Sequence, residues 1–228
     1  MLSHQYVLFL DTETSDKPKN WNSKDERMWP YIVQAAWLVC DLRGNKLVER
    51  NVIIRPDDFE IKQRAEHIHG ISEDLASREG ISRKEALRRF TTDLRHYKPL
   101  IVGHFIELDL RMVQMGLKRA GMKNILAGYQ TFCTMRGTSE YMHLPNRHYP
   151  QLGEIYQMLF KRKLQGAHNA LVDVNATAEV FFELLRRGEV SDQIIQQQHR
   201  MTENKEKKTG CGLALFLILL TLIQLWVL

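Results

Sequence analysis

Two carboxylates directly follow an apolar segment near the start of the chain. Residues 6–10 read YVLFL, which is typical of a strand buried on both faces, and Asp11, Thr12 and Glu13 come next. Because residues two apart on a strand point to the same side, both carboxylates are expected together at the strand end. Oxygen ligands of this kind suit a hard divalent cation such as Mg²⁺ or Mn²⁺. The pair alone also fits a solvated turn, so the interpretation depends on further acids.

Two more acids and a histidine occur in later segments with a helical pattern. Asp109 lies in the first turn of a helix predicted after the fourth strand, and Asp173 lies in the last predicted helix, five residues after His168. Four acids from separate elements could hold two metal ions, which stabilise both the attacking and the leaving oxygen in phosphodiester hydrolysis. His168 could then accept the proton of the attacking water. Taken by itself, His168 would be interpreted as an exposed helix histidine.

The elements that must position these residues follow an α/β pattern. Apolar runs predict strands at 6–10, 31–40, 47–54 and 100–105, and helical periodicity predicts helices at 82–97, 107–120, 151–161 and 168–187. Ser82 with Glu85 three residues later forms a capping box that begins the first of these helices. Strands linked as hairpins, followed by strands that alternate with helices, predict a mixed central sheet flanked by helices.

Four segments, in order, resemble the motifs of the DEDDh 3′–5′ exonucleases. They read DTET at 11–14, IHGIS at 68–72, GHFIELD at 103–109 and AHNALVD at 167–173. The resemblance extends from about residue 5 to residue 187. This family includes the proofreading subunit of bacterial DNA polymerase III, ribonuclease T and the three-prime repair exonucleases. One segment departs from the family pattern, because Phe105 and Leu108 stand where Asn and Phe are common.

The resemblance implies an α/β ribonuclease H-like fold, two Mg²⁺ or Mn²⁺ ions and release of nucleoside 5′-monophosphates from a 3′ end. Transferred by position, the metal-binding acids would be Asp11, Glu13, Asp109 and Asp173, with His168 as the general base. The residues expected to contact the terminal nucleotide are Thr12, Thr14, Ile68, His69 and His104.

Composition agrees with a nucleic-acid partner. The chain has 228 residues, with 32 Lys and Arg against 27 Asp and Glu, so its net charge of +5 mildly favours polyanions. An odd number of cysteines, three, indicates neither a disulfide framework nor a zinc site. Together with this charge, the resemblance to the DEDDh family implies a 3′–5′ exonuclease with DNA as the favoured substrate. Two alternatives stay open: an exoribonuclease similar to ribonuclease T or oligoribonuclease, and a non-catalytic module that binds 3′ ends.

The chain is expected to divide into an exonuclease domain at 1–190, a polar basic linker at 191–210 and a hydrophobic helix at 211–228. Residues 213–228 read LALFLILLTLIQLWVL, and at about 1.5 Å per residue such a helix is marginally long enough for a bilayer core. Lys205, Lys207 and Lys208 precede it, so the positive-inside rule predicts a single-pass anchor with the catalytic domain in the cytoplasm. No signal peptide and no polymerase-binding segment is evident, and the oligomeric state is not predicted.

A polar loop at 15–30 contains Trp21 and Trp29. These aromatic side chains could stack on the bases of a single strand. The favoured expectation is that both pack against the domain, which is the commoner arrangement for aromatic residues of a long loop.

Overall fold

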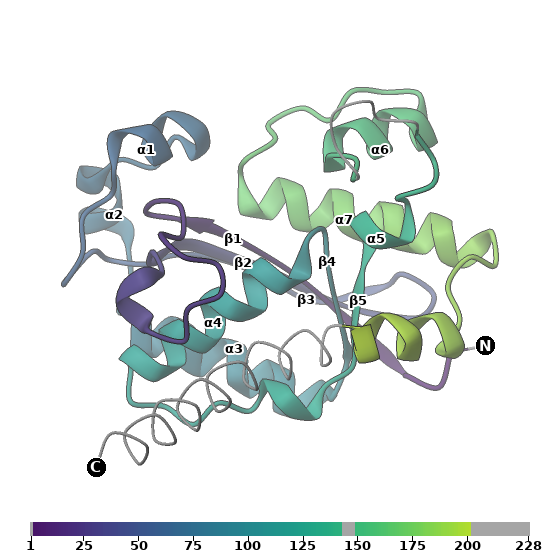
Figure 1. Cartoon of the computed structure of the whole chain (residues 1–228), viewed down its shortest axis with the longest axis horizontal. Coiled ribbons are helices and arrows are strands. Elements are labelled where there is room, and N and C mark those ends of the chain that lie inside the picture. Colours follow the sequence, from purple (N-terminus) through teal and green to yellow (C-terminus); the bar gives the residue numbers. More distant parts are fainter. Residues whose placement is uncertain (1, 143–148, 202–228) are drawn as a thin grey trace, which may run out of the picture.

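A five-stranded mixed sheet forms the centre of the computed structural model, which describes residues 2–142 and 149–201 (Figure 1). Its strands are β1 (Tyr6–Thr14), β2 (Ile32–Asp41), β3 (Lys46–Ile53), β4 (Leu100–Gly103) and β5 (Thr131–Cys133). The spatial order is β3-β2-β1-β4-β5. β1 and β3 both pair antiparallel with β2, whereas β4 pairs parallel with β1 and β5. The predicted mixed sheet, antiparallel first and parallel later, is confirmed.

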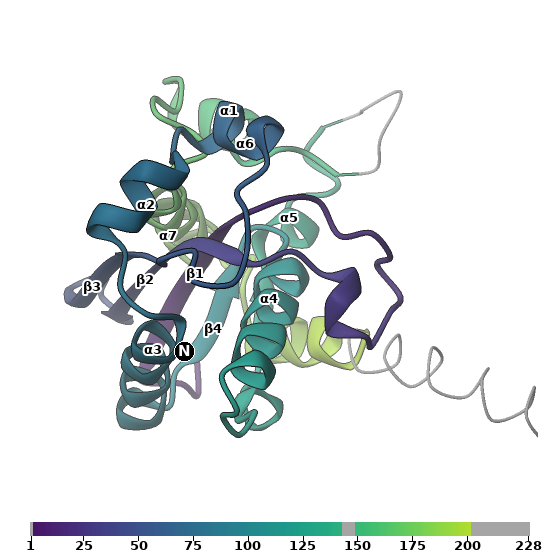
Figure 2. The same ribbon diagram turned by 90° about the vertical axis from the view of Figure 1, so that its left-hand side faces the viewer.

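Helices surround the sheet. They are α1 (Gln63–His69), α2 (Glu73–Glu79), α3 (Arg83–Tyr97), α4 (Ile106–Arg119), α5 (Thr134–Gly137), α6 (Leu152–Phe160) and α7 (Ala170–Arg186), with 3₁₀ turns η1 (Glu26–Met28) and η2 (Leu126–Gly128). α3 and α4 cover one face of the sheet and α7 covers the other (Figure 2). α1 and α6 lie at the same end of the sheet, on either side of the end of β1 (Figure 1).

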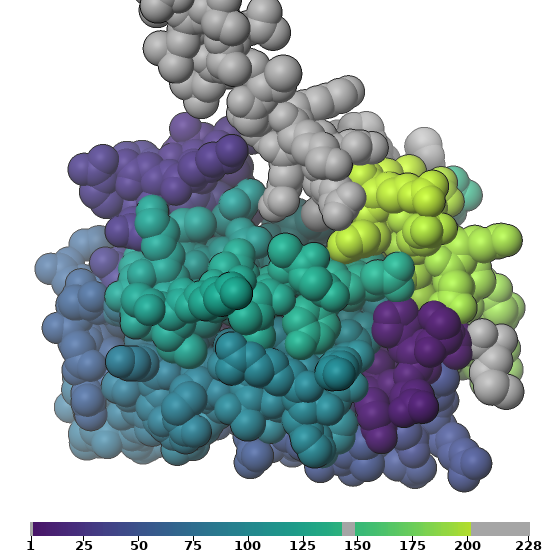
Figure 3. Space-filling model, turned by 90° about the horizontal axis from the view of Figure 1, so that it is seen from below, coloured from purple at the N-terminus to yellow at the C-terminus, as the bar shows by residue number. Residues whose placement is uncertain are grey.

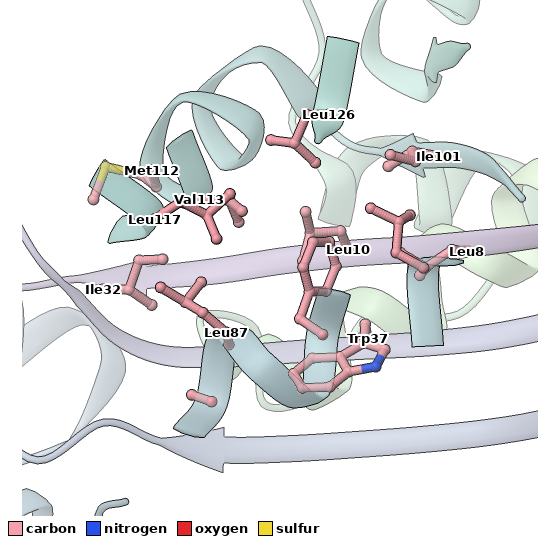
Figure 4. Packing of buried hydrophobic residues seen from close by; sticks show 14 of the residues in the cluster. Leu8, Leu10, Ile32, Trp37, Leu87, Ile101, Met112, Val113, Leu117 and Leu126 are labelled. Carbon is pink, nitrogen blue, oxygen red and sulfur yellow. The ribbon is translucent and has the colours of Figure 1, made fainter. Parts of the chain in front are cut away.

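Side-chain alternation along β1 builds a core on each face of the sheet. Leu8 and Leu10 pack with α3 and α4, where the cluster also contains Trp37 and Leu87 (Figure 4). Val7 and Phe9 point the other way and pack with α7. Because both sides of β1 are buried, its sequence is continuously apolar up to the point where the carboxylates begin.

The start of α3 agrees with its sequence signature. The Ser82 hydroxyl accepts a hydrogen bond from the Glu85 backbone N–H at 3.3 Å, as an N-cap residue does. α1, α2, β5 and α5 were not predicted from the sequence. Each has seven residues or fewer, which is too short for a periodic pattern to be recognised.

The predicted linker does not begin at residue 191, because residues 192–201 form a further helix that packs on the domain. Ile195 is fully buried in the core beside α7, and the Gln198 side chain accepts a hydrogen bond from the Cys133 backbone N–H at 2.8 Å. Figure 3 shows this helix in yellow, beside the teal segments of the domain. Most of its sequence, QIIQQQHRM at 193–201, is polar, and only a narrow face with Ile195 and Gln198 is buried.

Among residues 2–142 and 149–201, no helix combines the length and the apolar character that crossing a membrane requires. The hydrophobic segment at 211–228 lies outside the described residues.

Candidate active site

The end of β1 supplies the first two carboxylates. Asp11 and Glu13 continue the row of Val7 and Phe9 and therefore emerge on the face of the sheet that α7 covers. Thr12 emerges on the opposite face, toward α4. Strand alternation thus separates the two carboxylates from the threonine between them.

α4 brings Asp109 to the same strand end. Asp109 lies in the first turn of α4, is only 3% exposed, and accepts a hydrogen bond from the Thr12 hydroxyl at 2.7 Å. The first turn of a helix also favours a negative charge, because its backbone N–H groups point toward it. The strand–helix contact therefore fixes the orientation of the Asp109 carboxylate.

α7 supplies Asp173 and the segment that carries His168. The His168 backbone N–H donates to Asp173 Oδ2 at 2.9 Å, and single ligand atoms of Glu13, His168 and Asp173 all lie within 4.8 Å of one another. The helix begins at Ala170, with Asn169 as its N-cap, so the prediction that His168 lies inside the helix is wrong. His168 instead precedes the helix in a left-handed conformation, with φ of 67°, and is exposed.

Burial raises the pKa of every carboxyl group of the cluster, and neighbouring acids raise those of Asp11, Glu13 and Asp109 further. Burial raises the pKa of Asp109 to about 8, although the Thr12 hydrogen bond opposes the shift. Burial and then the Asp173 charge raise the pKa of Glu13 to about 7. The pKa of Asp11 is raised by burial and by the three other acids, and that of Asp173 by burial. Four acids so arranged favour protons or a cation among them.

The donor set fits a divalent metal ion. Asp173 Oδ1 is buried without a hydrogen-bond partner, which is costly for a carboxylate oxygen unless a cation completes its environment. The surrounding donors are carboxylate oxygens and one imidazole, and oxygen-rich sets of this kind suit Mg²⁺ or Mn²⁺. The residues that would hold metal are Asp11, Glu13, Asp109 and Asp173.

A small cavity of about 110 Å³ adjoins Glu13 on the side of α1. Thr14, Ile68 and His69, all predicted to contact the terminal nucleotide, line it together with Arg64. Ile68 is 51% exposed, whereas His69 is buried and its Nδ1 accepts a hydrogen bond from the Ile71 backbone N–H at 3.1 Å. The structure thus places an apolar side chain and a fixed imidazole next to the carboxylates.

Two predicted substrate contacts have structural partners instead. His104 Nδ1 lies 3.0 Å from the Thr134 hydroxyl and His104 Nε2 lies 3.1 Å from the Pro150 carbonyl oxygen. Burial also lowers the pKa of His104 to about 4, so the ring is neutral at pH 7. Thr12 is similarly buried and donates to Asp109. Both geometries favour positioning roles over contact with a nucleotide.

Gln34 is a positioning residue that the sequence analysis did not identify. It is 3% exposed on β2, opposite Glu13, and its Oε1 accepts a hydrogen bond from the Ala170 backbone N–H at 3.1 Å. Its Nε2 donates to Asn51 at 2.8 Å. Gln34 therefore ties the first residue of α7 to the sheet beside the carboxylates. The sequence does contain one sign of this role, because Gln34 is the single polar residue within the apolar run YIVQAAWLVC at 31–40.

A larger cavity, of about 540 Å³, lies elsewhere, between the β2–β3 hairpin and α7. Among its described lining residues one is acidic, Glu179, and that carboxylate already accepts hydrogen bonds from Tyr156 and Arg162. The carboxylate cluster, rather than the larger volume, is where hydrolytic chemistry is possible.

Comparisons with known proteins identify the family and the fold. The exonuclease family model RNase_T matches residues 8–181. The nuclease domain of 3′hExo, described as a DEDDh family member bound to rAMP, is 13% identical with a TM-score of 0.65, over 82% of this chain and 94% of that chain. Escherichia coli exonuclease I in complex with a dT13 oligonucleotide is 19% identical with a TM-score of 0.64, over 81% of this chain and 42% of that chain. Exonuclease I from Methylocaldum szegediense is 21% identical with a TM-score of 0.61, over 80% and 40% respectively.

The protein belongs to the exonuclease family, and the resemblance to DEDDh 3′–5′ exonucleases is confirmed. Its fold is that of the ribonuclease H-like exonucleases. The chain spans about two fifths of the length of the exonuclease I structures that it matches. A comparison with curated proteins gave no match.

Proposed function

We propose that the protein removes nucleotides from the 3′ end of a nucleic acid, with DNA as the favoured substrate, and releases nucleoside 5′-monophosphates. The observation that carries the proposal is the convergence of four carboxylates from β1, α4 and α7 beside an exposed histidine. Binding a 3′ end would not by itself require this set of acids, each of which is costly to bury beside the others.

Two divalent ions held by the four carboxylates would activate water and stabilise the leaving 3′ oxygen. Asp109 is held rigidly by Thr12, and Asp173 by the backbone N–H of His168, so two of the donor groups are already oriented. Among the described residues, the ring nitrogens of His168 have no hydrogen-bond partner. The imidazole is therefore available to accept a proton from a water molecule near Glu13 and Asp173.

The direct test is neutralisation of single carboxylates. Asp11→Ala and Asp173→Asn should each abolish hydrolysis of a 3′-labelled oligonucleotide while the circular dichroism spectrum and melting curve stay those of a folded domain. Asp74→Asn is the matched control, because Asp74 is 76% exposed and paired on the helix surface with Arg78. Substantial activity in a metal-replete Asp11 and Asp173 double variant would overturn the assignment. Parallel DNA and RNA substrates separate a deoxyribonuclease from the exoribonuclease alternative.

We also propose that residues 211–228 anchor the protein in a membrane with the catalytic domain on the cytoplasmic side. The support is the apolar run at 213–228 and the lysines that precede it. In a flotation experiment, the full chain should float with vesicles, and a chain ending at residue 201 should stay at the bottom of the gradient. Equal behaviour of the two chains would contradict the proposal.

A further inference from the structure

An aromatic cluster lies at the N-terminal end of α4, the helix whose first turn carries Asp109. Trp21 is 51% exposed, and its ring centroid lies 5.8 Å from that of Phe105, with 38° between the ring planes. Phe105 is the N-cap of α4 and precedes Asp109 by four residues, about one turn of the helix. The loop with Trp21 follows Thr14 at the end of β1. Both aromatic residues therefore belong to segments that directly adjoin metal-binding positions.

The position of Trp21 is fixed by residues beneath it. Trp29 is 4% exposed and meets Trp21 edge to face, with centroids 5.8 Å apart. Arg119 on α4 donates to the carbonyl oxygens of Pro30 at 2.6 Å and Trp29 at 2.7 Å, which ties the end of the loop to the helix. The sequence-based expectation of a packed loop therefore holds for Trp29, whereas Trp21 is left half exposed on a rigid base.

Phe105 has an unusual backbone for its residue type. Its φ is 72° and its ψ is 43°, a left-handed conformation that Gly and Asn adopt readily and that bulky residues rarely adopt. The DEDDh pattern commonly has Asn at this position, which would fit the backbone better. Backbone strain of this kind persists where the surrounding structure holds it, and it clusters at ligand sites. Here the strained residue presents an aromatic ring next to Trp21.

The surroundings favour a polyanion whose bases are exposed. Lys17 and Lys19 are exposed on the same loop, and Lys17 also lines the small cavity next to Glu13. Aromatic faces combined with nearby cations are what proteins use to hold single-stranded nucleic acid, because every base offers a flat face. Bases inside a duplex are stacked on each other and offer no such face.

We propose that Trp21 and Phe105 form a stacking surface for unpaired bases that lie upstream of the 3′-terminal nucleotide, so that the preferred substrate is a single-stranded 3′ end. This inference rests on the proposed exonuclease function and deepens it by naming the substrate class. Stacking acts on binding rather than on the chemical step, since neither ring lies among the metal-binding carboxylates.

The first test is the dependence of KM on substrate length. Trp21→Ala should raise KM for a single-stranded decamer by roughly 5- to 150-fold, the range for loss of one stacked base. The ratio of the decamer KM to the dinucleotide KM should rise accordingly, because a dinucleotide has little chain to place on the surface. Trp21→Phe should restore most of the decamer affinity, and Trp21→Leu should not. Leu47→Ala is the matched control, since Leu47 is 45% exposed at the start of β3, at the other end of the sheet.

The second test removes the base instead of the ring. A substrate with a single abasic site, placed in turn at each of the first five positions upstream of the 3′ end, should bind less well to the parent enzyme at one or two positions. At those positions Trp21→Ala should show no further loss, because the stacking partner is already missing. Additive losses at every position, or an unchanged decamer KM in Trp21→Ala, would overturn the proposal.

Phe105→Asn gives an independent variant, because Asn suits the left-handed backbone and should fold at least as well. It should raise the decamer KM while leaving the melting temperature equal or higher. If the parent enzyme degrades single-stranded and blunt duplex substrates equally well, the single-strand assignment is wrong although the exonuclease function stands. If the parent enzyme hydrolyses no oligonucleotide with Mg²⁺ or Mn²⁺, the proposed function itself fails.

Discussion

In the absence of a divalent ion, the carboxylate cluster should make the protein less stable as the pH rises. Burial raises the pKa of Asp109 from an ordinary value of 3.8 to about 8, and burial with the Asp173 charge raises that of Glu13 from 4.5 to about 7. Between pH 6.5 and 8 the unfolded chain has both groups ionised, whereas the folded protein still holds protons on them over part of this window. The folded state therefore binds more protons, and the free energy of unfolding falls as pH rises.

The size of this effect follows from the two pKa values. Each group contributes at most about 1.4 kcal/mol per pH unit, and both give up their protons partway through the window, so we expect a total loss of about 2 kcal/mol from pH 6.5 to 8. His104 has the opposite effect at lower pH, where it makes the free energy of unfolding rise as the pH rises. Burial lowers the pKa of His104 to about 4, so its contribution is complete above the unfolded value of 6.5 and is lost only as pH falls below it. The range from pH 6.5 to 8 therefore reports mainly on the carboxyl groups and little on His104.

Urea denaturation in EDTA at four pH values between 6.5 and 8 measures this loss. Asp109→Asn should remove more than half of the pH dependence and should be more stable than the parent at pH 8, because the amide can still accept the Thr12 hydrogen bond. Mg²⁺ in place of EDTA should flatten the parent profile. A metal-free stability that stays constant or rises over this window, with the same slope in Asp109→Asn, would refute the electrostatic reasoning.

Three further variants probe single contacts. Thr12→Val removes the hydroxyl that donates to Asp109. It should raise the Mg²⁺ concentration for half-maximal activity by roughly 10- to 100-fold, as loss of a residue that orients a metal ligand does. An unchanged Mg²⁺ requirement would contradict the positioning role of Thr12. His168→Gln should lower kcat by roughly 10²- to 10⁴-fold with little change in KM, and a rate that stays within twofold would exclude His168 as the base. Ile195→Ala should lower the free energy of unfolding by about 2–5 kcal/mol, as for a buried isoleucine. If Ile195→Ala instead unfolds at the same urea concentration as the parent, the helix at 192–201 does not pack on the domain.

The parts of the fold predicted from sequence are those that local patterns determine. The apolar run before Asp11 determines a strand buried on both faces, and the period of two places Asp11 with Glu13. The end of α7 near residue 187 and the N-cap at Ser82 could likewise be predicted from the sequence. The order of the four acids along the chain, together with His168, was sufficient to predict the family.

The remaining features depend on contacts between distant segments. Burial keeps the His104 ring neutral, and the Pro150 carbonyl oxygen, 46 residues away in the sequence, helps to fix its orientation; no local pattern reveals either effect. The helix at 192–201 buries little more than Ile195 and Gln198 in an otherwise polar sequence, so it resembled a linker. The left-handed backbone of Phe105 follows from the turn between β4 and α4, and only the structure shows that its ring meets Trp21.

The central claim is tested most directly by incubating the purified full chain with 3′- and 5′-labelled single-stranded DNA and RNA in Mg²⁺, Mn²⁺ or EDTA. We expect stepwise release of mononucleotides from the 3′ end, faster on DNA, that EDTA abolishes and Asp173→Asn lacks. Release from the 5′ end, cleavage that persists in EDTA, or no cleavage under any metal while 3′ ends bind tightly would contradict the proposed exonuclease.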